Sequence, residues 1–299
     1  MKQGLLFAAL AWLCAGDARA QQVPDRDYLP QIAQPQYAAG KGPVVCVDEA
    51  HFNFHTLDGR FFAFGALLKR DGFQVRASTA PFDAAALARC RVLVISNAQP
   101  SNDEWDKYPR PTPSAFTDAE IAAVRAWVDG GGSLLLIADH MPLAGAAAKL
   151  AAAFDVEFSD GFAVREPRSD QHDLFTRAAG TLRSHAITRG ITQIRTFTGQ
   201  AFLAPKAEAL LVFPAGYVQL LPEKAWEFSA RTPRIPVEGR LQAAVQKSGR
   251  GRAAFFGEAA MFSAQLAGPG REPMGMNSAG AGQNFEFVLN LLHWLTGTL

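Results

Sequence analysis

Short apolar runs alternate with amphipathic segments along the central part of the chain. Runs of apolar and β-branched residues predict strands, and segments whose apolar residues recur every three or four positions predict helices. The predicted strands cover residues 44–47, 73–77, 92–96, 133–138, 209–213 and 253–256. The predicted helices cover residues 60–70, 117–129, 143–154 and 285–295.

Two of these helices carry clear boundary or facing signals. Thr117 and Glu120 form a capping-box pattern at the start of one helix, and three glycines from Gly130 onward end it. In the last helix, Leu289 and Leu292 recur at helical spacing and should face inward.

Strands that alternate with helices favour a parallel sheet covered on both faces. The sequence therefore predicts a doubly wound, mainly parallel, three-layer α/β fold of the flavodoxin-like or amidotransferase-like kind. We expect a single α/β domain over residues 43–299, with an insertion or lid at about 155–192, where charged and turn residues gather. Residues 21–42 are rich in proline and glycine and predict an extended lead-in.

The first twenty residues have the pattern of a secretory signal peptide. Lys2 precedes an apolar stretch over residues 5–13, and Ala18-Arg19-Ala20 is a small-x-small cleavage signal. We expect cleavage after Ala20 and a periplasmic or secreted protein. The apolar stretch is too short to span a bilayer, and no later run reaches spanning length, so we expect no membrane span.

The charge balance narrows the classes of partner. The full chain has a formal net charge of +1, which falls to zero once Lys2, Asp17 and Arg19 leave with the signal peptide. No basic field remains to hold nucleic acid, so nucleic acid is not an expected partner. Nearly half of the residues are apolar, which allows a sizeable core.

Cys46 and Cys90 are the two cysteines that remain after cleavage. In an oxidising compartment they could pair. Because Cys46 lies inside an apolar predicted strand, two buried free thiols are the favoured interpretation.

Three segments at the ends of predicted strands carry groups that can ligate metals or move protons. These are residues 48–55, 138–140 and 257–258, and they hold His51, His55, His140 and four carboxylates. Open α/β sheets place their sites at the carboxyl ends of strands. We therefore expect the three segments to contribute to one site.

The first segment favours metal or acid/base chemistry. His51 and His55 are four residues apart and share a face whether the segment is helical or extended. Beside Asp48 and Glu49 they could hold a divalent metal with an open water position, or one histidine could act as general base with a carboxylate to orient it. Asn53, between them, is a candidate substrate contact. The alternative is that such side chains cap the next helix and satisfy loop amides, which is the interpretation favoured for Asp48, Thr56 and Asp58.

The other two segments offer further ligands. Asp139 and His140 end the most apolar strand, and Glu258 follows a later one. If the strand at 133–138 lies two positions from the strand at 44–47, their ends are roughly 10 Å apart, so long side chains could bridge them around a ligand but not as one tight triad. Gln200 and Asn277, in turn-prone settings, are weaker candidates for substrate contacts.

Serine chemistry has little support in the sequence. There is neither a Gly-x-Ser-x-Gly elbow nor a phosphate-binding loop of the Walker type. Ser96 and Ser263 lie near strand ends and are either nucleophiles or turn hydroxyls.

The three strand-end segments also carry a family resemblance. The runs VDEAH at 47–51, IADHMP at 137–142 and GEAAMF at 257–262 resemble a secreted bacterial group of unassigned function in the class I glutamine amidotransferase-like superfamily. The match covers nearly all of the mature chain. Members with amidotransferase activity use a cysteine nucleophile after a central strand, where this chain has Asp139 and His140. The resemblance therefore implies the fold but no glutaminase activity, and it transfers no catalytic residue.

Three hypotheses follow for function. The leading one is a hydrolase in which Glu49, His51, His55 and His140 are catalytic, or in which His51, His55, Asp139, His140 and Glu258 bind a divalent metal. The alternative is a non-catalytic periplasmic module that binds a small molecule, a carbohydrate or a partner protein. That module would use aromatic residues, namely Trp105, Tyr108, Trp226 and Phe228. The third is a structural polar network at the sheet edge.

Overall fold

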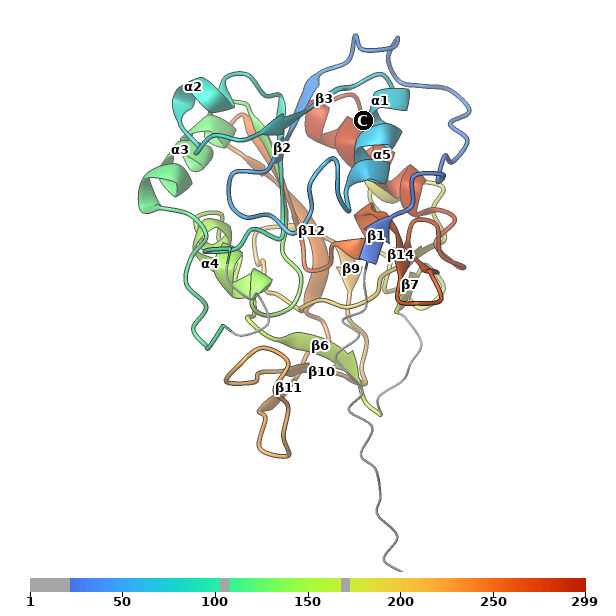
Figure 1. Ribbon diagram of the computed structural model, residues 1–299. Helices are drawn as coiled ribbons and strands as arrows, with labels where there is room; N and C mark the ends of the chain where they lie inside the picture. Colours follow the sequence, from blue (N-terminus) through green and yellow to red (C-terminus); the bar gives the residue numbers. More distant parts are fainter. Residues whose placement is uncertain (1–21, 103–107, 168–172) are drawn as a thin grey trace, which may run out of the picture.

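A seven-stranded sheet runs through the centre of the protein (Figure 1). The computed structural model describes residues 22–102, 108–167 and 173–299. The strand order in this sheet is β3-β2-β4-β5-β13-β12-β9. Its strands are β2 (Val44–Asp48), β3 (Gln74–Ser78), β4 (Val92–Ser96), β5 (Ser133–Ile137), β9 (Glu208–Val212), β12 (Leu241–Ser248) and β13 (Gly251–Phe256).

Strand direction changes within this sheet. β3, β2, β4, β5 and β13 are parallel neighbours, so their carboxyl ends meet at one edge. β12 runs antiparallel to both β13 and β9. The tight turn from β12 into β13 passes through Gly249, whose φ of +53° is in the left-handed region that favours glycine.

Helices cover both faces of the sheet. α1 (Phe62–Arg70) and α5 (Asn284–Thr296) pack on one face, whose core contains Leu67 and Leu291. α3 (Asp118–Asp129) and α4 (Leu143–Ala152) pack on the other, whose core contains Val124 and Leu150. The short α2 (Ala84–Leu87) lies beside α3 (Figure 1).

Three smaller sheets surround this core, and all their pairings are antiparallel. The first is β1-β14-β15 and the second is β11-β10-β6, which lies at the lower end of the molecule in Figure 1. The third pairs β7 with β8. Their strands are β1 (Gln22–Pro24), β6 (Phe162–Arg165), β7 (Leu174–Thr176), β8 (Gln193–Arg195), β10 (Tyr217–Leu220), β11 (Arg234–Pro236), β14 (Ala264–Ala267) and β15 (Glu272–Gly275). Two 3-10 helices are η2 (Ala186–Thr188) and η3 (Ala260–Phe262).

Many individual elements agree with the sequence pattern. Each of the six predicted strands coincides with an observed strand, and no boundary differs by more than two residues. The capping box at Thr117 and Glu120 is present, and α3 ends at Gly130. Leu289 and Leu292 of α5 are buried. Local patterning therefore identified the parallel strands and most of the helices.

The predicted fold class, a doubly wound, mainly parallel, three-layer α/β fold, is wrong. The central sheet is mixed, the three additional sheets are antiparallel, and strands outnumber helices in the described part of the chain. The reason lies after residue 154, where tight turns such as that at Gly249 reverse the chain without a crossover helix. Between α4 and α5 the described residues contain strands and 3-10 turns but no α-helix.

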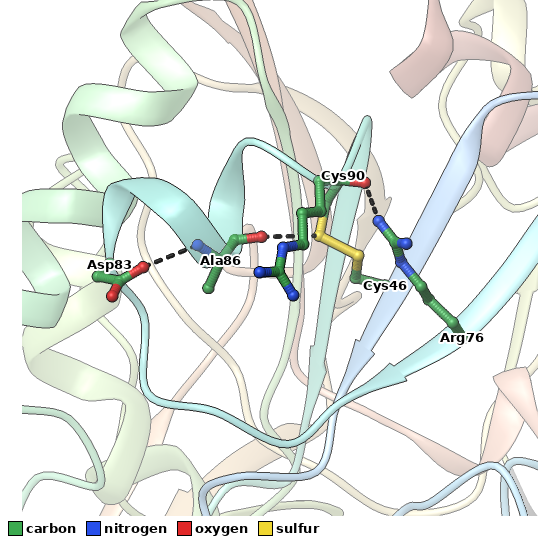
Figure 2. Close-up of a disulfide and its surroundings, with 6 residues drawn as sticks. Cys46, Arg76, Asp83, Ala86 and Cys90 are labelled. Carbon is green, nitrogen blue, oxygen red and sulfur yellow. Dashed lines mark hydrogen bonds between the residues drawn. A yellow bond between two sulfur atoms is a disulfide. The ribbon is translucent and has the colours of Figure 1, made fainter.

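Cys46 and Cys90 form a disulfide, so the prediction of two free thiols is wrong (Figure 2). Cys46 lies in β2, and Cys90 precedes β4, which pairs with β2. Their Cα atoms are 5.7 Å apart, a usual separation for a disulfide. The Asp83 carboxylate accepts the N–H of Ala86 at 2.7 Å at the start of α2, and the Cys90 sulfur lies 3.7 Å from the Ala86 carbonyl oxygen.

Part of the segment before residue 43 contributes to the fold. β1 pairs with β14, and the Tyr37 ring packs on Phe73 with centroids 5.0 Å apart. The predicted signal peptide and Trp105 lie outside the described residues. Within the residues searched, no helix has the length and apolar character needed to cross a bilayer.

Candidate functional site

The strand-end segments do meet at one edge of the central sheet. β5 lies two positions from β2, the spacing that the separation of roughly 10 Å assumed, and β13 is parallel to β5. Asp48 ends β2, and Asp139 and Glu258 follow β5 and β13, so all three lie at the same edge. The contacts of their side chains divide this edge into two separate groups.

His51 lies between two carboxylates. Its Nδ1 is 2.9 Å from both carboxylate oxygens of Asp48, and its Nε2 is 2.9 Å from Oε1 of Glu120. The rings of Phe82 and Phe116 pack against it with centroids 4.5 and 4.8 Å away. Both ring nitrogens are therefore donors to carboxylates in a closed, aromatic environment.

The two carboxylates favour the protonated imidazolium. Burial alone lowers the pKa of His51, but the hydrogen bonds and charges of Asp48 and Glu120 outweigh it and raise the pKa. Burial likewise raises the pKa of Glu120, but the N–H of Thr117 and the His51 ring outweigh it and lower the pKa to about 2. With both nitrogens engaged, His51 offers no lone pair to a metal or a substrate proton in this arrangement.

His55 is also enclosed and points to a different partner. Its Nδ1 is 3.0 Å from Oγ of Ser96, and its ring packs on Phe61 with centroids 4.6 Å apart. Burial, followed by the positive charge of Arg60, lowers the pKa of His55 to about 3. His55 is therefore neutral at physiological pH, and Ser96, which is fully buried, is not placed to act as a nucleophile.

Glu49 and Asn53 hold the loop after β2. Oε1 of Glu49 accepts the N–H of Leu57 at 2.7 Å. Asn53 donates to Oδ2 of Asp48 at 3.0 Å and accepts the N–H of His51 at 3.1 Å. Both residues also line a cavity on the outer side of this loop.

Asp139 and His140 belong to the second group, beside a set of aromatic rings. Oδ1 of Asp139 accepts the N–H of His140 at 2.9 Å and the hydroxyl of Thr198 at 3.2 Å. The His140 ring stacks on Phe162 at 4.7 Å and meets Trp226 edge-on at 4.8 Å, while its Nδ1 is 2.8 Å from the Met141 carbonyl oxygen. His140 thus forms part of an aromatic cluster.

Glu258 is fully buried at the start of η3. Its carboxyl oxygens accept the N–H groups of Ala260 at 2.6 Å and Met261 at 2.9 Å. Burial and the nearby charge of Asp139 raise the pKa of Glu258 well above its ordinary value, despite these hydrogen bonds. Glu258 is therefore a carboxyl group that favours its neutral form beside the carboxyl group of Asp139.

The two weaker candidates, Gln200 and Asn277, make hydrogen bonds within the protein. Gln200 is fully buried, accepts the N–H of Ser159 at 2.5 Å and donates to the Ala138 carbonyl at 3.0 Å. Asn277 donates to Asp25 at 2.9 Å and to the Gln265 carbonyl at 3.0 Å, in the β1-β14-β15 region. The side chain of Gln200 is thus engaged within the protein, and Asn277 is held by a different sheet.

Across residues 22–102, 108–167 and 173–299, no group of three or more His, Cys, Asp or Glu side chains is arranged to hold a metal ion. The structure explains the separation of the predicted set. His51 is engaged by Asp48 and Glu120, His55 by Ser96, and Glu258 by backbone N–H groups. The five predicted ligands therefore do not form one coordination shell.

An open pocket lies next to the second group. Its volume is about 140 Å³, and its wall includes Phe162, Arg165, Asp173, Thr198 and Trp226. An adjoining cavity of about 420 Å³ shares Arg165 and Phe228 with it. Thr198 connects the pocket to the Asp139 carboxylate. The adjacent Gly199 has a φ of +127°, and any side chain there would collide with the carbonyl of Gly257.

The sequence identified Trp226 and Phe228 but not the rest of this pocket. Arg165 donates to the hydroxyl of Tyr217, which in turn donates to Asp173. Arg165 lies in β6, Tyr217 in β10, and Asp173 directly before β7. No local pattern indicated that β6 pairs with β10. Arg165 and Asp173 belong to the charged region 155–192, and that gathering of charge was the available signal.

No protein-family model matches the chain, and no curated protein matches it. Similar solved structures include the N-terminal domain of mmIFT52, at 13% identity and a TM-score of 0.60, covering 84% of this chain and 97% of that domain. A cytoplasmic protein from Salmonella typhimurium has 15% identity and a TM-score of 0.49, covering 85% and 98%. A ThuA-like protein from Bacteroides uniformis has 14% identity and a TM-score of 0.44, covering 87% and 93%.

The similarity to the mmIFT52 domain concerns the fold alone, because so low an identity carries no information on activity. The protein thus combines a mixed seven-stranded sheet with a polar, aromatic pocket beyond the ends of its parallel strands.

Proposed function

We propose that the protein binds a small carbohydrate or a similar polyhydroxylated molecule in the pocket lined by Trp226, Phe228, Arg165, Asp173 and Thr198. The observation that carries this proposal is the exposure of two large aromatic rings at a pocket with polar walls. Trp226 is 41% exposed and Phe228 is 38% exposed. Exposed aromatic residues grouped around a concave site are a feature of binding surfaces.

The ring geometry suits a flat, partly apolar ligand. The Phe162 ring lies 4.8 Å from Trp226 and 5.1 Å from Phe228, both edge-to-face, so the three rings support one another. Trp226 has a φ of +67°, a strained conformation for a non-glycine residue that must be held by its surroundings. Sugar rings carry C–H faces that stack on such aromatic groups, and their hydroxyls can pair with Arg165, Asp173 and Thr198.

A second candidate function is glycoside hydrolysis at the same pocket. Thr198 lines the pocket and donates to Asp139, and the pKa of Glu258 is raised by burial and by Asp139. Glycoside hydrolysis uses a pair of carboxyl groups, and a raised pKa is the mark of the one that acts as the acid. Against a direct role, Glu258 is fully buried and both its oxygens accept backbone N–H groups.

We also propose that the protein acts in the periplasm or outside the cell. Support comes from the signal-peptide pattern and from the Cys46–Cys90 disulfide, because structural disulfides persist in oxidising compartments. A resemblance to a secreted group of the amidotransferase-like superfamily is part of the same proposal.

The binding proposal is tested by titrating the full chain with a panel of monosaccharides and disaccharides in a calorimeter. We expect saturable binding to at least one sugar and a loss of at least tenfold in affinity for Trp226→Ala and Phe228→Ala. Leu29→Ala, which removes an exposed apolar side chain before β2, is the matched control and should bind as the native protein does. Absence of binding across the panel, or unchanged affinity in both aromatic variants, would refute the proposal.

The two candidates are separated by product analysis. If the pocket hydrolyses the bound sugar, Asp139→Asn should abolish product formation while binding persists. If the native protein binds the sugar and releases it unchanged, the site is a binding site only.

A further inference from the structure

A second cavity lies over the loop between β2 and α1, lined by residues different from those of the aromatic pocket. Its volume is about 430 Å³. The polar side chains in its wall include those of Glu49, Asn53, Thr56, Arg60 and Gln99. The rings of Phe52 and Phe54 add an apolar side. This combination of one cation, several hydrogen-bonding groups and two aromatic rings suits an amphipathic ligand.

Arg60 is the cation of this cavity, and it is held in place by Phe54. Its guanidinium carbon lies 3.8 Å from the centroid of the Phe54 ring, and its Nη1 donates to the Phe54 carbonyl at 3.3 Å. Its Nε is buried and has no hydrogen-bond partner. The guanidinium therefore has a fixed orientation but unused donor capacity.

No described carboxylate forms an ion pair with Arg60. Glu49 lines the same cavity, but its Oε1 accepts the N–H of Leu57 and it makes no ion pair with Arg60. Burial lowers the pKa of Arg60, and the uncompensated charge helps to lower the pKa of His55. Buried charges in proteins are normally paired, so a half-buried arginine that faces a cavity without a counter-charge is exceptional.

The aromatic side of the cavity is also unusual. Phe52 is 51% exposed and has a φ of +46°, a strained conformation for a bulky residue. Gln99 maintains this conformation, because its side-chain amide donates to the Phe52 carbonyl at 2.6 Å and its backbone N–H donates to the His51 backbone carbonyl at 2.9 Å. The fold thus keeps a large apolar ring exposed at the mouth of this cavity.

We infer that this cavity binds a small organic oxyanion, whose carboxylate or phosphate group pairs with Arg60 and whose apolar part contacts Phe52 and Phe54. The planar guanidinium matches either oxyanion through paired, charge-assisted hydrogen bonds. The bound anion supplies the counter-charge that the protein itself does not place beside Arg60. This site is independent of the proposed carbohydrate pocket.

The test is calorimetric titration of the full chain with three probes, namely acetate, benzoate and inorganic phosphate. Benzoate should bind more tightly than acetate because its ring contacts Phe52 and Phe54. Phosphate separates recognition of the charged group from recognition of the apolar part. Arg60→Gln should weaken benzoate binding at least tenfold. Arg26→Gln is the matched control, because Arg26 also stacks on a phenylalanine, Phe62, at 4.3 Å but does not line the cavity.

A second variant keeps the inference testable if Arg60→Gln does not fold. Glu49→Gln removes the negative charge from the cavity wall and retains an acceptor for Leu57, so benzoate should bind about threefold more tightly. Three results would overturn the inference. They are no binding of any probe at millimolar concentration, benzoate binding that Arg60→Gln leaves unchanged, and benzoate binding that Glu49→Gln leaves unchanged or weakens.

Discussion

His51 and Glu120 are 69 residues apart in the sequence, yet Nε2 of His51 lies 2.9 Å from Oε1 of Glu120. Because Glu120 is also the third residue of the α3 capping box, this contact fixes the loop after β2 to the start of that helix. Asp48 holds the opposite nitrogen of the same ring. The histidine is thus a charged cross-link between two carboxylates.

This cross-link predicts a specific pH dependence of stability. The pKa of His51 is raised above 6.5 in the folded state, so its contribution is fully present below pH 6.5 and is lost as the pH rises through the folded pKa. We expect His51→Gln to lower the free energy of unfolding by about 3 kcal/mol at pH 6, because it leaves buried carboxylates without a cation. The difference should shrink at pH 9, as measured by urea unfolding.

The matched control is His185→Gln. Burial lowers the pKa of His185. The difference in free energy of unfolding between this variant and the native protein should therefore not shrink as the pH rises from 6 to 9. A destabilisation by His51→Gln that is constant from pH 6 to pH 9 would contradict the assignment of an imidazolium.

The pKa values of the two histidines of the first segment are shifted in opposite directions. The pKa of His55 is lowered to about 3, whereas that of His51 is raised. In an NMR titration, the ring signals of His55 should remain those of a neutral imidazole from pH 8 to pH 5, while the midpoint of the His51 titration should lie above pH 6.5. A His55 signal that titrates near pH 6.5 would show that its ring is open to water, contrary to its packing on Phe61.

The contribution of Glu258 to stability should depend on pH in the opposite sense to that of an ordinary carboxylate. Its pKa is raised by burial and by Asp139, so its destabilising effect grows as the pH rises above 4.5 through the folded pKa. Glu258→Gln should cost about 1–2 kcal/mol at pH 4.5, because one backbone N–H loses its acceptor. That cost should decrease toward pH 8, as measured by unfolding at each pH. A cost that increases with pH would mean that Glu258 is a stabilising carboxylate.

The Cys46–Cys90 disulfide closes a sequence separation of 44 residues. In the chain-entropy account a loop of this length stabilises the fold by about 3–4 kcal/mol. Replacement of both cysteines by alanine should therefore lower the free energy of unfolding by about that amount. Dithiothreitol should destabilise the native protein and leave the double variant unaffected. Two titratable thiols in the denatured, unreduced protein would exclude the bond.

The sequence predicted what local patterns determine. Apolar runs identified the parallel strands, and the acidic residues at or just after their carboxyl ends, Asp48, Asp139 and Glu258, do lie at one sheet edge. Hydrogen-bond partners were not predictable in this way. The capping box of α3 already accounted for Glu120, so nothing in the sequence indicated that its side chain also contacts His51. The strand β12 was also not predicted. It carries Gln242, Gln246 and Lys247 and lacks the continuous apolar pattern of the other central strands.

The aromatic pocket was the least predictable part of the candidate site. Trp226 was recognisable as an aromatic loop residue, but Phe162 and Arg165 lie in a segment read as an insertion. Their position depends on antiparallel pairing between β6 and β10, which are more than 50 residues apart. Long-range pairing of short strands leaves little trace in local periodicity.

The covalent link between Cys46 and Cys90 encloses the loop that carries Phe52 and Arg60. A protease that cut the exposed peptide near Phe52 would therefore produce two fragments that stay attached to each other. Such a nick would be invisible on a non-reducing gel and would appear as two bands only after the sulfur bridge is opened.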